Sequence, residues 1–221
     1  MSKLTLIIGN KNYSSWSLRP WIFMKQTHIE FAEKRIALYT DSADQETAEY
    51  FSDFKVPVLM DGDLVVWDSL AILEYLSENY LDGAGWPRDI RARAIARSVS
   101  AEMHSSFANM RKELPMNCRR KFTDFTCSAA AQHDIQRIKA IWHKCRTDYG
   151  DRGDWLFGEY SIADAMFAPV VSRFETYGIE LNALEQAYAQ NTLNNPHIMQ
   201  WMEAGRQEKE IIEASEIKIR G

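Results

Sequence analysis

FKVPVLMDGDLVVWDSLAILEYLSENY, residues 54–80, is the stretch that decides the fold of this 221-residue chain. Its apolar run 56–60 has its only proline near the start, where a strand can lose one N–H without losing its ladder. Asp61-Gly62 predicts a two-residue hairpin, after which 64–67 forms the returning strand. Asp68-Ser69 then supplies cap-type side chains for a helix with apolar residues at i, i+4 spacing. Free N–H groups at that helix start favour a small polar ligand.

This order of Val-Pro, Asp-Gly and a D-S-x-A-I-x-x-Y-L helix resembles the glutathione-binding half of glutathione transferases. The resemblance implies a thioredoxin-like N-terminal domain in which Pro57 is cis and Val56 pairs through its backbone with the cysteinyl part of glutathione. It also implies that Asp68 and Ser69 hold the γ-glutamyl end. The residues alone allow a simpler interpretation, in which Asp68 and Ser69 only cap a helix and Pro57 only marks a strand start.

Composition indicates a globular protein, with 46% hydrophobic and 12% aromatic residues. No apolar stretch approaches the roughly 20 residues that span a bilayer, and the N-terminus lacks a basic start followed by a long apolar core. We therefore expect a soluble, cytoplasmic protein with no membrane partner. Residues 1–80 carry 7 Lys/Arg against 12 Asp/Glu, and the remaining residues carry 19 of each. Without a basic excess, nucleic acid is not an expected partner.

The number and positions of the cysteines exclude some kinds of chemistry. All three, Cys118, Cys127 and Cys145, lie in the second part of the chain, and they show neither CxxC spacing nor a histidine cluster. We therefore expect no metal site. Because residues 1–80 contain no thiol, a thioredoxin-like domain there cannot carry out disulfide exchange or cysteine-type thiol transfer.

The first 80 residues predict a small α/β domain. The continuous apolar run 4–8 favours a buried strand, and 33–39 alternates enough to be a second one. A helix between them runs toward Gln26. Since proline is tolerated only in the first turn, Pro20 makes Ser17 the earliest comfortable cap. Residues 40–54 predict a loop with a short helix.

The rest of the chain predicts an all-α helical bundle. We expect domains at residues 1–80 and 89–221, joined by a linker at 81–88 that contains Gly and Pro. A capping box at Ser161 and Asp164 predicts the start of a core helix. The other expected helices run from Asp89 to about Cys118 with a break near Pro115, from Ser128 to Tyr149, and from Pro196 to about Lys209.

The polar stretch YSSWSLR, residues 13–19, is the candidate catalytic segment. It resembles the serine-type motif of the family, most closely the zeta class, where S-S-C-S is followed two residues on by Arg. The resemblance implies that Ser14 activates the glutathione thiol, and that Trp16 stands where that class has cysteine. Tyr13 and Ser15 stay open as alternatives, because other branches use a tyrosine hydroxyl. A polar loop that only caps a helix is the remaining interpretation.

Two further assignments complete the predicted site. Lys55 stands where zeta-type sequences carry a glutamine that contacts glutathione, so it is either a partner for the glycyl carboxylate or a solvated lysine. His104, Phe107 and Arg111 fall at i, i+3, i+7 on one predicted helix face, so with Trp16 they form the candidate wall of an apolar electrophile pocket with one cation. A phenylalanine at such a position is also a common core residue.

The resemblance thus implies a homodimeric, glutathione-dependent transferase that acts in detoxification on a small electrophile. A narrower alternative is isomerisation of maleylacetoacetate, in which glutathione adds to a double bond and leaves again. A third is a non-catalytic scaffold of the same fold that binds proteins. The acidic first domain and an arginine-rich helix after the linker fit a dimer, with Arg91, Arg93 and Arg97 as candidates for ion pairs across the interface.

Overall fold

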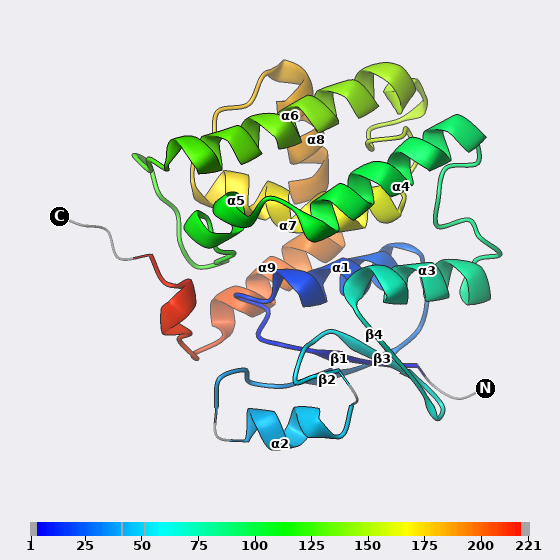
Figure 1. Cartoon of the computed structure of the whole chain (residues 1–221), viewed down its shortest axis with the longest axis vertical. Coiled ribbons are helices and arrows are strands. Elements are labelled where there is room, and N and C mark those ends of the chain that lie inside the picture. Colours follow the sequence, from blue (N-terminus) through cyan, green and yellow to red (C-terminus); the bar gives the residue numbers. More distant parts are fainter. Residues whose placement is uncertain (1–3, 41, 51, 218–221) are drawn as a thin grey trace.

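The computed structural model describes residues 4–40, 42–50 and 52–217 and shows a small sheet region beside a larger helical region (Figure 1). The sheet has the strand order β2-β1-β3-β4. β1 runs parallel to β2, whereas the β1–β3 and β3–β4 pairs are antiparallel. The strands are β1 (Thr5–Ile8), β2 (Ala32–Arg35), β3 (Val58–Asp61) and β4 (Leu64–Trp67). This mixed sheet with its helices confirms the prediction of a thioredoxin-like α/β domain. Residues 1–3 and 218–221, which the predicted domains include, lie outside the described residues.

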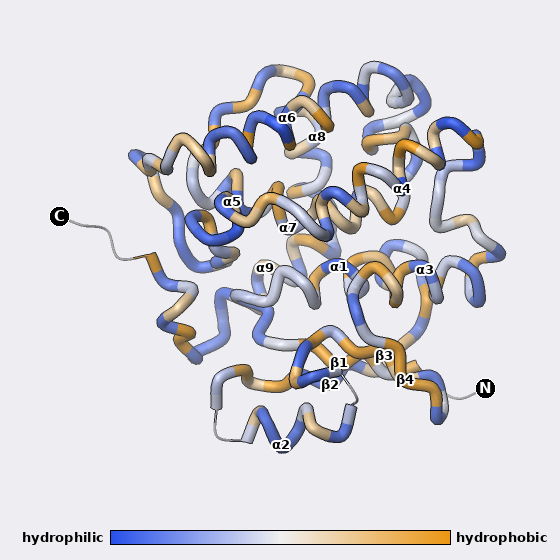
Figure 2. The backbone as a smooth tube through the Cα atoms, in the orientation of Figure 1, coloured by the Kyte–Doolittle hydropathy of each residue, from blue (hydrophilic) through white to orange (hydrophobic). Residues whose placement is uncertain are grey.

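Helices cover both faces of the sheet. α1 (Ser15–Gln26) and α3 (Ser69–Tyr80) lie on one side, and α2 (Ala43–Ala48) lies on the other (Figure 1). Because successive side chains of a strand point to opposite faces, Leu6 and Ile8 enter the main core while Ile7 packs in a smaller cluster on the α2 side. Figure 2 shows hydrophobic residues along β3 and β4. The apolar run of β1 is therefore buried on both sides, as predicted.

Two details of the sheet differ from the prediction. The second strand, predicted at 33–39, spans only Ala32–Arg35. The hairpin turn lies one residue later than predicted, because Asp61 pairs with Leu64 and leaves Gly62 and Asp63 as the turn. Gly62 has a φ of 63°, a backbone conformation that glycine adopts without steric cost.

The helical region is organised around α7 (Ile162–Thr176), most of whose side chains are buried. α7 packs against α1, α4 and α8, so one hydrophobic core joins the two regions. The predicted capping box between Ser161 and Asp164 is present at its start. The surrounding helices are α4 (Ile90–Ser105), α5 (Ala108–Glu113), α6 (Ala129–Tyr149), α8 (Ala183–Leu193) and α9 (Pro196–Gln207), with 3-10 turns at Gly150–Arg152 and Glu213–Ser215.

The predicted helical bundle is confirmed in outline. α6 matches the predicted helix, and its apolar side chains face the core: Ile135, Ile138, Ile141, Trp142 and Cys145 are buried. Residues 81–89, between α3 and α4, form turns and bends without a regular element. Within the described residues, no helix combines the length and the apolar character that a membrane crossing needs.

The predicted long helix from Asp89 to about Cys118 is wrong. α4 ends at Ser105, and the break lies at Phe107 rather than near Pro115. Phe107 adopts a left-handed φ of 66°, and its side chain is buried in the core. Burial of this aromatic ring offsets the strain of the backbone, a gain that helical periodicity cannot reveal. His104, Phe107 and Arg111 therefore do not share one helix face.

The sequence prediction was wrong for two other helices. α1 begins at Ser15 with Ser14 as its N-cap, so Ser17 is not the cap and Pro20 lies inside the helix. Since proline lacks an N–H, the helix gives up the hydrogen bond to the carbonyl of Trp16 there. α8 was missed altogether, although Asn182 and Glu185 form a capping box at its start. The N-x-x-E pattern was the signal that could have found it.

Candidate active site

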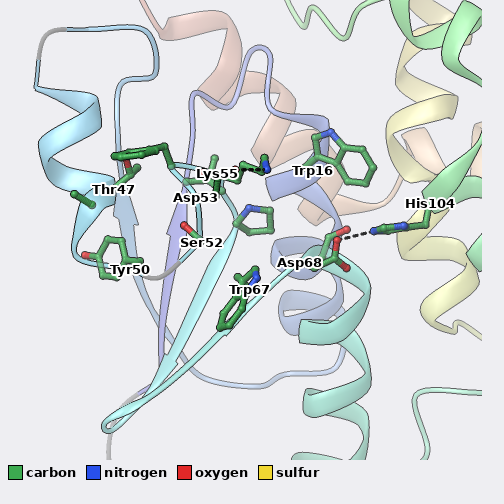
Figure 3. A pocket seen from close by; sticks show the side chains of 14 residues that line it. Trp16, Thr47, Tyr50, Ser52, Asp53, Lys55, Trp67, Asp68 and His104 are labelled. Atoms are coloured by element: carbon green, nitrogen blue, oxygen red, sulfur yellow. Dashed lines mark hydrogen bonds and ion pairs between the residues drawn. The ribbon is translucent and has the colours of Figure 1, made fainter.

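A large cavity lies where the loop before β3 meets the starts of α1 and α3. Its volume is about 1050 Å³, and a second cavity of about 420 Å³ adjoins it and shares Trp16, Lys55 and Val56. Figure 3 shows Trp16, Trp67, Asp68 and His104 around the larger cavity. Its lining consists of Trp16, Thr47, Ala48, Tyr50, Ser52, Asp53, Phe54, Lys55, Val56, Pro57, Trp67, Asp68, Ser69 and His104. The structure thus brings most of the predicted site residues to one cavity.

The Val56–Pro57 peptide bond is cis, as the resemblance implied. Both residues line the larger cavity immediately before β3. Lys55, next to them, is exposed and pairs with Asp53, with 2.7 Å between Lys55 Nζ and Asp53 Oδ2. Its contact with a ligand carboxylate therefore stays a prediction.

Asp68 and Ser69 form the polar end of the cavity at the start of α3. Asp68 Oδ1 accepts hydrogen bonds from the N–H groups of Leu70 (2.8 Å) and Ala71 (3.3 Å), so the carboxylate caps the helix. Its other oxygen, Oδ2, lies 2.6 Å from Nε2 of His104, a residue of α4. Ser69 is 1% exposed, and its hydroxyl has no hydrogen-bond partner among the described residues. A buried hydroxyl of this kind is costly unless it binds something, so it indicates a ligand contact.

Sequence reasoning missed Ser52. Its side chain is 2% exposed, its hydroxyl also lacks a partner among the described residues, and it lines the same cavity (Figure 3). No sequence motif surrounds Ser52. The path of the chain after α2 brings this residue to the cavity. Only the tertiary structure could identify this residue.

The three candidate hydroxyls of the catalytic segment all line the second cavity. The Ser14 hydroxyl donates to Ser17 Oγ (2.8 Å) and accepts the Ser17 N–H (3.3 Å), so it caps α1. The Tyr13 hydroxyl donates to Glu216 (2.6 Å) and accepts from Arg119. Burial, followed by the bond to Glu216, raises the pKa of Tyr13. The Tyr13 hydroxyl is therefore occupied by the C-terminal segment.

Trp16, His104 and Arg111 meet, although the predicted helix face does not exist. The Trp16 and His104 rings lie 5.4 Å apart edge to face, and the Arg111 guanidinium lies 4.8 Å from the Trp16 ring. Arg19 lies 4.1 Å from the same ring. Phe107, by contrast, packs in the core and does not line the cavity. Its assignment to the electrophile pocket is not supported by the geometry.

Three arginines lie near the start of α1, and two of them, Arg19 and Arg173, are buried. Burial, with the charge of Arg111 adding to it, lowers the pKa of Arg173 to about 9, and burial lowers the pKa of Arg111 to about 10. Burial also places the pKa of Arg19 well below its ordinary value. Guanidinium groups nevertheless stay protonated in proteins, so these side chains are cations at neutral pH. Among the described residues no cluster of His, Cys, Asp and Glu is suited to a metal ion.

Residues 13–79 match the family model for the glutathione S-transferase N-terminal domain. A dichloromethane dehalogenase from Methylophilus leisingeri is 39% identical over 66 residues, a match that covers 29% of this chain and only 25% of that protein. A probable maleylacetoacetate isomerase from Caenorhabditis elegans is 25% identical over 174 residues, covering 76% and 77% of the two chains. The crystal structure of a Burkholderia glutathione transferase homologue with bound glutathione superposes with a TM-score of 0.69 at 22% identity, covering 94% of this chain and 100% of that one. Residues 13–79 thus match a glutathione S-transferase N-terminal domain, and the chain as a whole shares the fold of that crystal structure.

Proposed function

We propose that this protein binds glutathione in the cavity at the start of α3 and transfers its thiolate to a small electrophile. The observation that carries the proposal is the buried Ser69 hydroxyl, which has no hydrogen-bond partner among the described residues and lies beside the Asp68 carboxylate at a helix N-terminus. A γ-glutamyl group brings a carboxylate and an ammonium, which fit that hydroxyl and the Asp68 carboxylate. The N-terminal family match and the glutathione-bound neighbour support the same ligand.

The bound thiol then needs help to ionise. An unperturbed thiol has a pKa of about 8.5 and is mostly protonated at pH 7. A hydroxyl that donates to the sulfur and a helix N-terminus behind it both favour the thiolate. Lowering the pKa by about two units requires roughly 2.7 kcal/mol, which is within the range of one charge-assisted hydrogen bond and a helix dipole. We assign this role first to Ser14, the N-cap of α1.

Retention on immobilised glutathione, followed by titration of the thiolate absorbance of the bound ligand, tests the proposal. A transferase is retained by the immobilised glutathione, and it lowers the thiol pKa of the glutathione that it binds. A non-catalytic scaffold either fails to bind glutathione or binds it with an unshifted thiol. The role in detoxification and the cytoplasmic location stay predictions.

Isomerisation is the second candidate, because a probable maleylacetoacetate isomerase matches three quarters of the chain. Trp16, in place of the cysteine of zeta-type sequences, counts against it. Incubation with glutathione and maleylacetoacetate distinguishes the two reactions, since an isomerase forms the trans product without consuming glutathione.

We predict that Ser69→Ala weakens glutathione binding by about 1–2 kcal/mol, because the change removes one ligand hydrogen bond. The fold should be preserved, since Asp68 still caps α3. Isothermal titration with glutathione and a thermal melt measure the two quantities. Normal affinity in the variant would show that Ser69 only occupies a helix start.

We also predict a homodimer, with a solution mass of twice 25.6 kDa at micromolar concentration. Large apolar side chains are exposed on β4 and at the start of α4, including Trp67 (44%) and Ile90 (71%), and a partner subunit would cover them. Of the predicted interface arginines, Arg93 bonds to backbone carbonyls of its own chain and Arg97 lies 3.7 Å from Glu74. Light scattering measures the mass, and a monomer across this range would contradict the prediction.

A further inference from the structure

Three arginines from different elements form a buried cationic cluster at the start of α1. Arg19 lies on α1, Arg111 on α5 and Arg173 on α7; Arg19 is fully buried, Arg173 is 5% exposed and Arg111 is half-buried. Arg19 and Arg111 both lie against the Trp16 ring. Burial is the main reason that the pKa values of Arg19 and Arg173 are lowered; the charge of Arg111 adds to both shifts, and that of Arg173 adds to the shift of Arg19.

The hydrogen-bond partners of this cluster are neutral. Arg19 Nε donates to the Met166 carbonyl (3.3 Å), and both of its terminal nitrogens lack a partner among the described residues. Arg111 and Arg173 donate to backbone carbonyls and, in one case, to a serine hydroxyl. None of the three forms an ion pair with a carboxylate within the described residues. Uncompensated buried charge is costly, so the cluster favours an anion nearby.

Arg173 connects the cluster to the catalytic segment. Its Nη2 donates to Ser15 Oγ at 2.9 Å, in a buried bond between α7 and the first turn of α1. Because Ser15 Oγ accepts from a cation, its own proton is a stronger donor and can be directed elsewhere. No acceptor for that proton is found in the part of the chain that the structure describes, and Ser15 lines the second cavity. The Ser14 proton is directed to Ser17 and must turn away from it to reach a bound sulfur.

We propose that Ser15, polarised by Arg173, donates a second hydrogen bond to the glutathione thiolate, and that Arg19 and Arg111 add positive potential beside it. The inference rests on the proposed function and deepens it. Ser15 acts on the sulfur directly, whereas Arg173 is a positioning residue that acts through Ser15. The thiolate is then the anion that the buried cations lack.

The other charged groups around the two cavities partly cancel. Asp53 pairs with Lys55, and the Asp68 carboxylate lies 2.6 Å from Nε2 of His104, which carries a charge only when it is protonated. Asp44 lines the second cavity from α2, and on the far side Tyr13 is held by Arg119 and Glu216. The unpaired cations of the cluster therefore dominate the local charge beside Ser15.

The test compares the thiol pKa of bound glutathione in the wild type, Ser15→Ala, Arg173→Gln and the double variant. We expect each single change to raise that pKa by about one unit, which is about a tenfold loss of thiolate below the pKa. The double variant should show less than the sum, because Arg173 acts through Ser15. Arg173→Lys, which keeps the charge, should recover most of the shift.

Arg146→Gln is the matched control. Arg146 also donates to backbone carbonyls, those of Gly150 and Gly153, but at the end of α6 and away from the cavities. Its loss should reduce stability without moving the thiol pKa. If Arg173→Gln does not fold, Ser15→Ala and Arg111→Gln carry the test. An unchanged thiol pKa in Ser15→Ala with glutathione bound overturns the inference, as do additive single effects. Failure of the wild type to bind glutathione would instead overturn the proposed function.

Discussion

Replacing Ser14 with alanine should lower transferase activity at pH 7 by about 30- to 150-fold while leaving glutathione affinity nearly unchanged. The hydroxyl stabilises the thiolate far more than the thiol, so its loss affects the charged form and spares binding through Val56, Asp68 and Ser69. A charge-assisted hydrogen bond of roughly 2–3 kcal/mol corresponds to this range of thiolate population. Because the variant acts by raising the thiol pKa, activity near pH 9 should partly recover.

Tyr13→Phe is the control for this prediction. The Tyr13 hydroxyl is bound by Glu216 and Arg119, so its removal should leave the pH profile of activity unchanged. Ser14→Ala also removes the cap of α1, worth about 1 kcal/mol, and a thermal melt separates that loss from the kinetic effect. A shifted thiol titration in Tyr13→Phe, with none in Ser14→Ala, would transfer the catalytic role to the tyrosine.

The features that could be predicted from the sequence are those set by local chemistry. Val-Pro before a strand, a glycine turn and an aspartate cap follow one another within 54–80, so each element limits where the next can begin. The capping box at Ser161 is equally local, since donor and acceptor lie three residues apart. These patterns predicted most of the sheet region and a ligand site beside α3, whereas the cis peptide bond was implied by the resemblance to glutathione transferases.

The features that could not be predicted depend on tertiary contacts. Phe107 ends α4 because its ring is buried in a core that the helical pattern does not show. Ser52 reaches the cavity through the path of the chain after α2, and Arg173 reaches Ser15 across 158 residues of sequence. Pro20 is accepted inside α1, where packing against α7 offsets the lost hydrogen bond. Periodicity and spacing carry no information on such contacts.

Replacing Asp164 with alanine should destabilise the protein by about 3–5 kcal/mol, because two buried N–H groups and a hydroxyl lose their acceptor. Asp164 is 1% exposed, and it accepts from the N–H groups of Leu156 and Ser161 at 2.9 Å each and from the Ser161 hydroxyl at 3.1 Å. The carboxylate therefore ties the turn before α7 to the first turn of that helix. Urea unfolding of the variant and the wild type measures the difference.

The same pair of proteins gives a pH test. Burial raises the pKa of Asp164 from 3.8 to about 6, with its hydrogen bonds opposing the shift. A raised pKa means that the folded state binds the proton more tightly than the unfolded state, so this contribution is fully present below pH 3.8 and is lost as pH rises through about 6. The free energy of unfolding of the wild type, relative to that of Asp164→Ala, should therefore increase by about 1 kcal/mol when the pH is lowered from 7 to 5. Groups common to both proteins cancel in this difference, so a gap that does not change with pH would show that the buried carboxyl keeps an ordinary pKa.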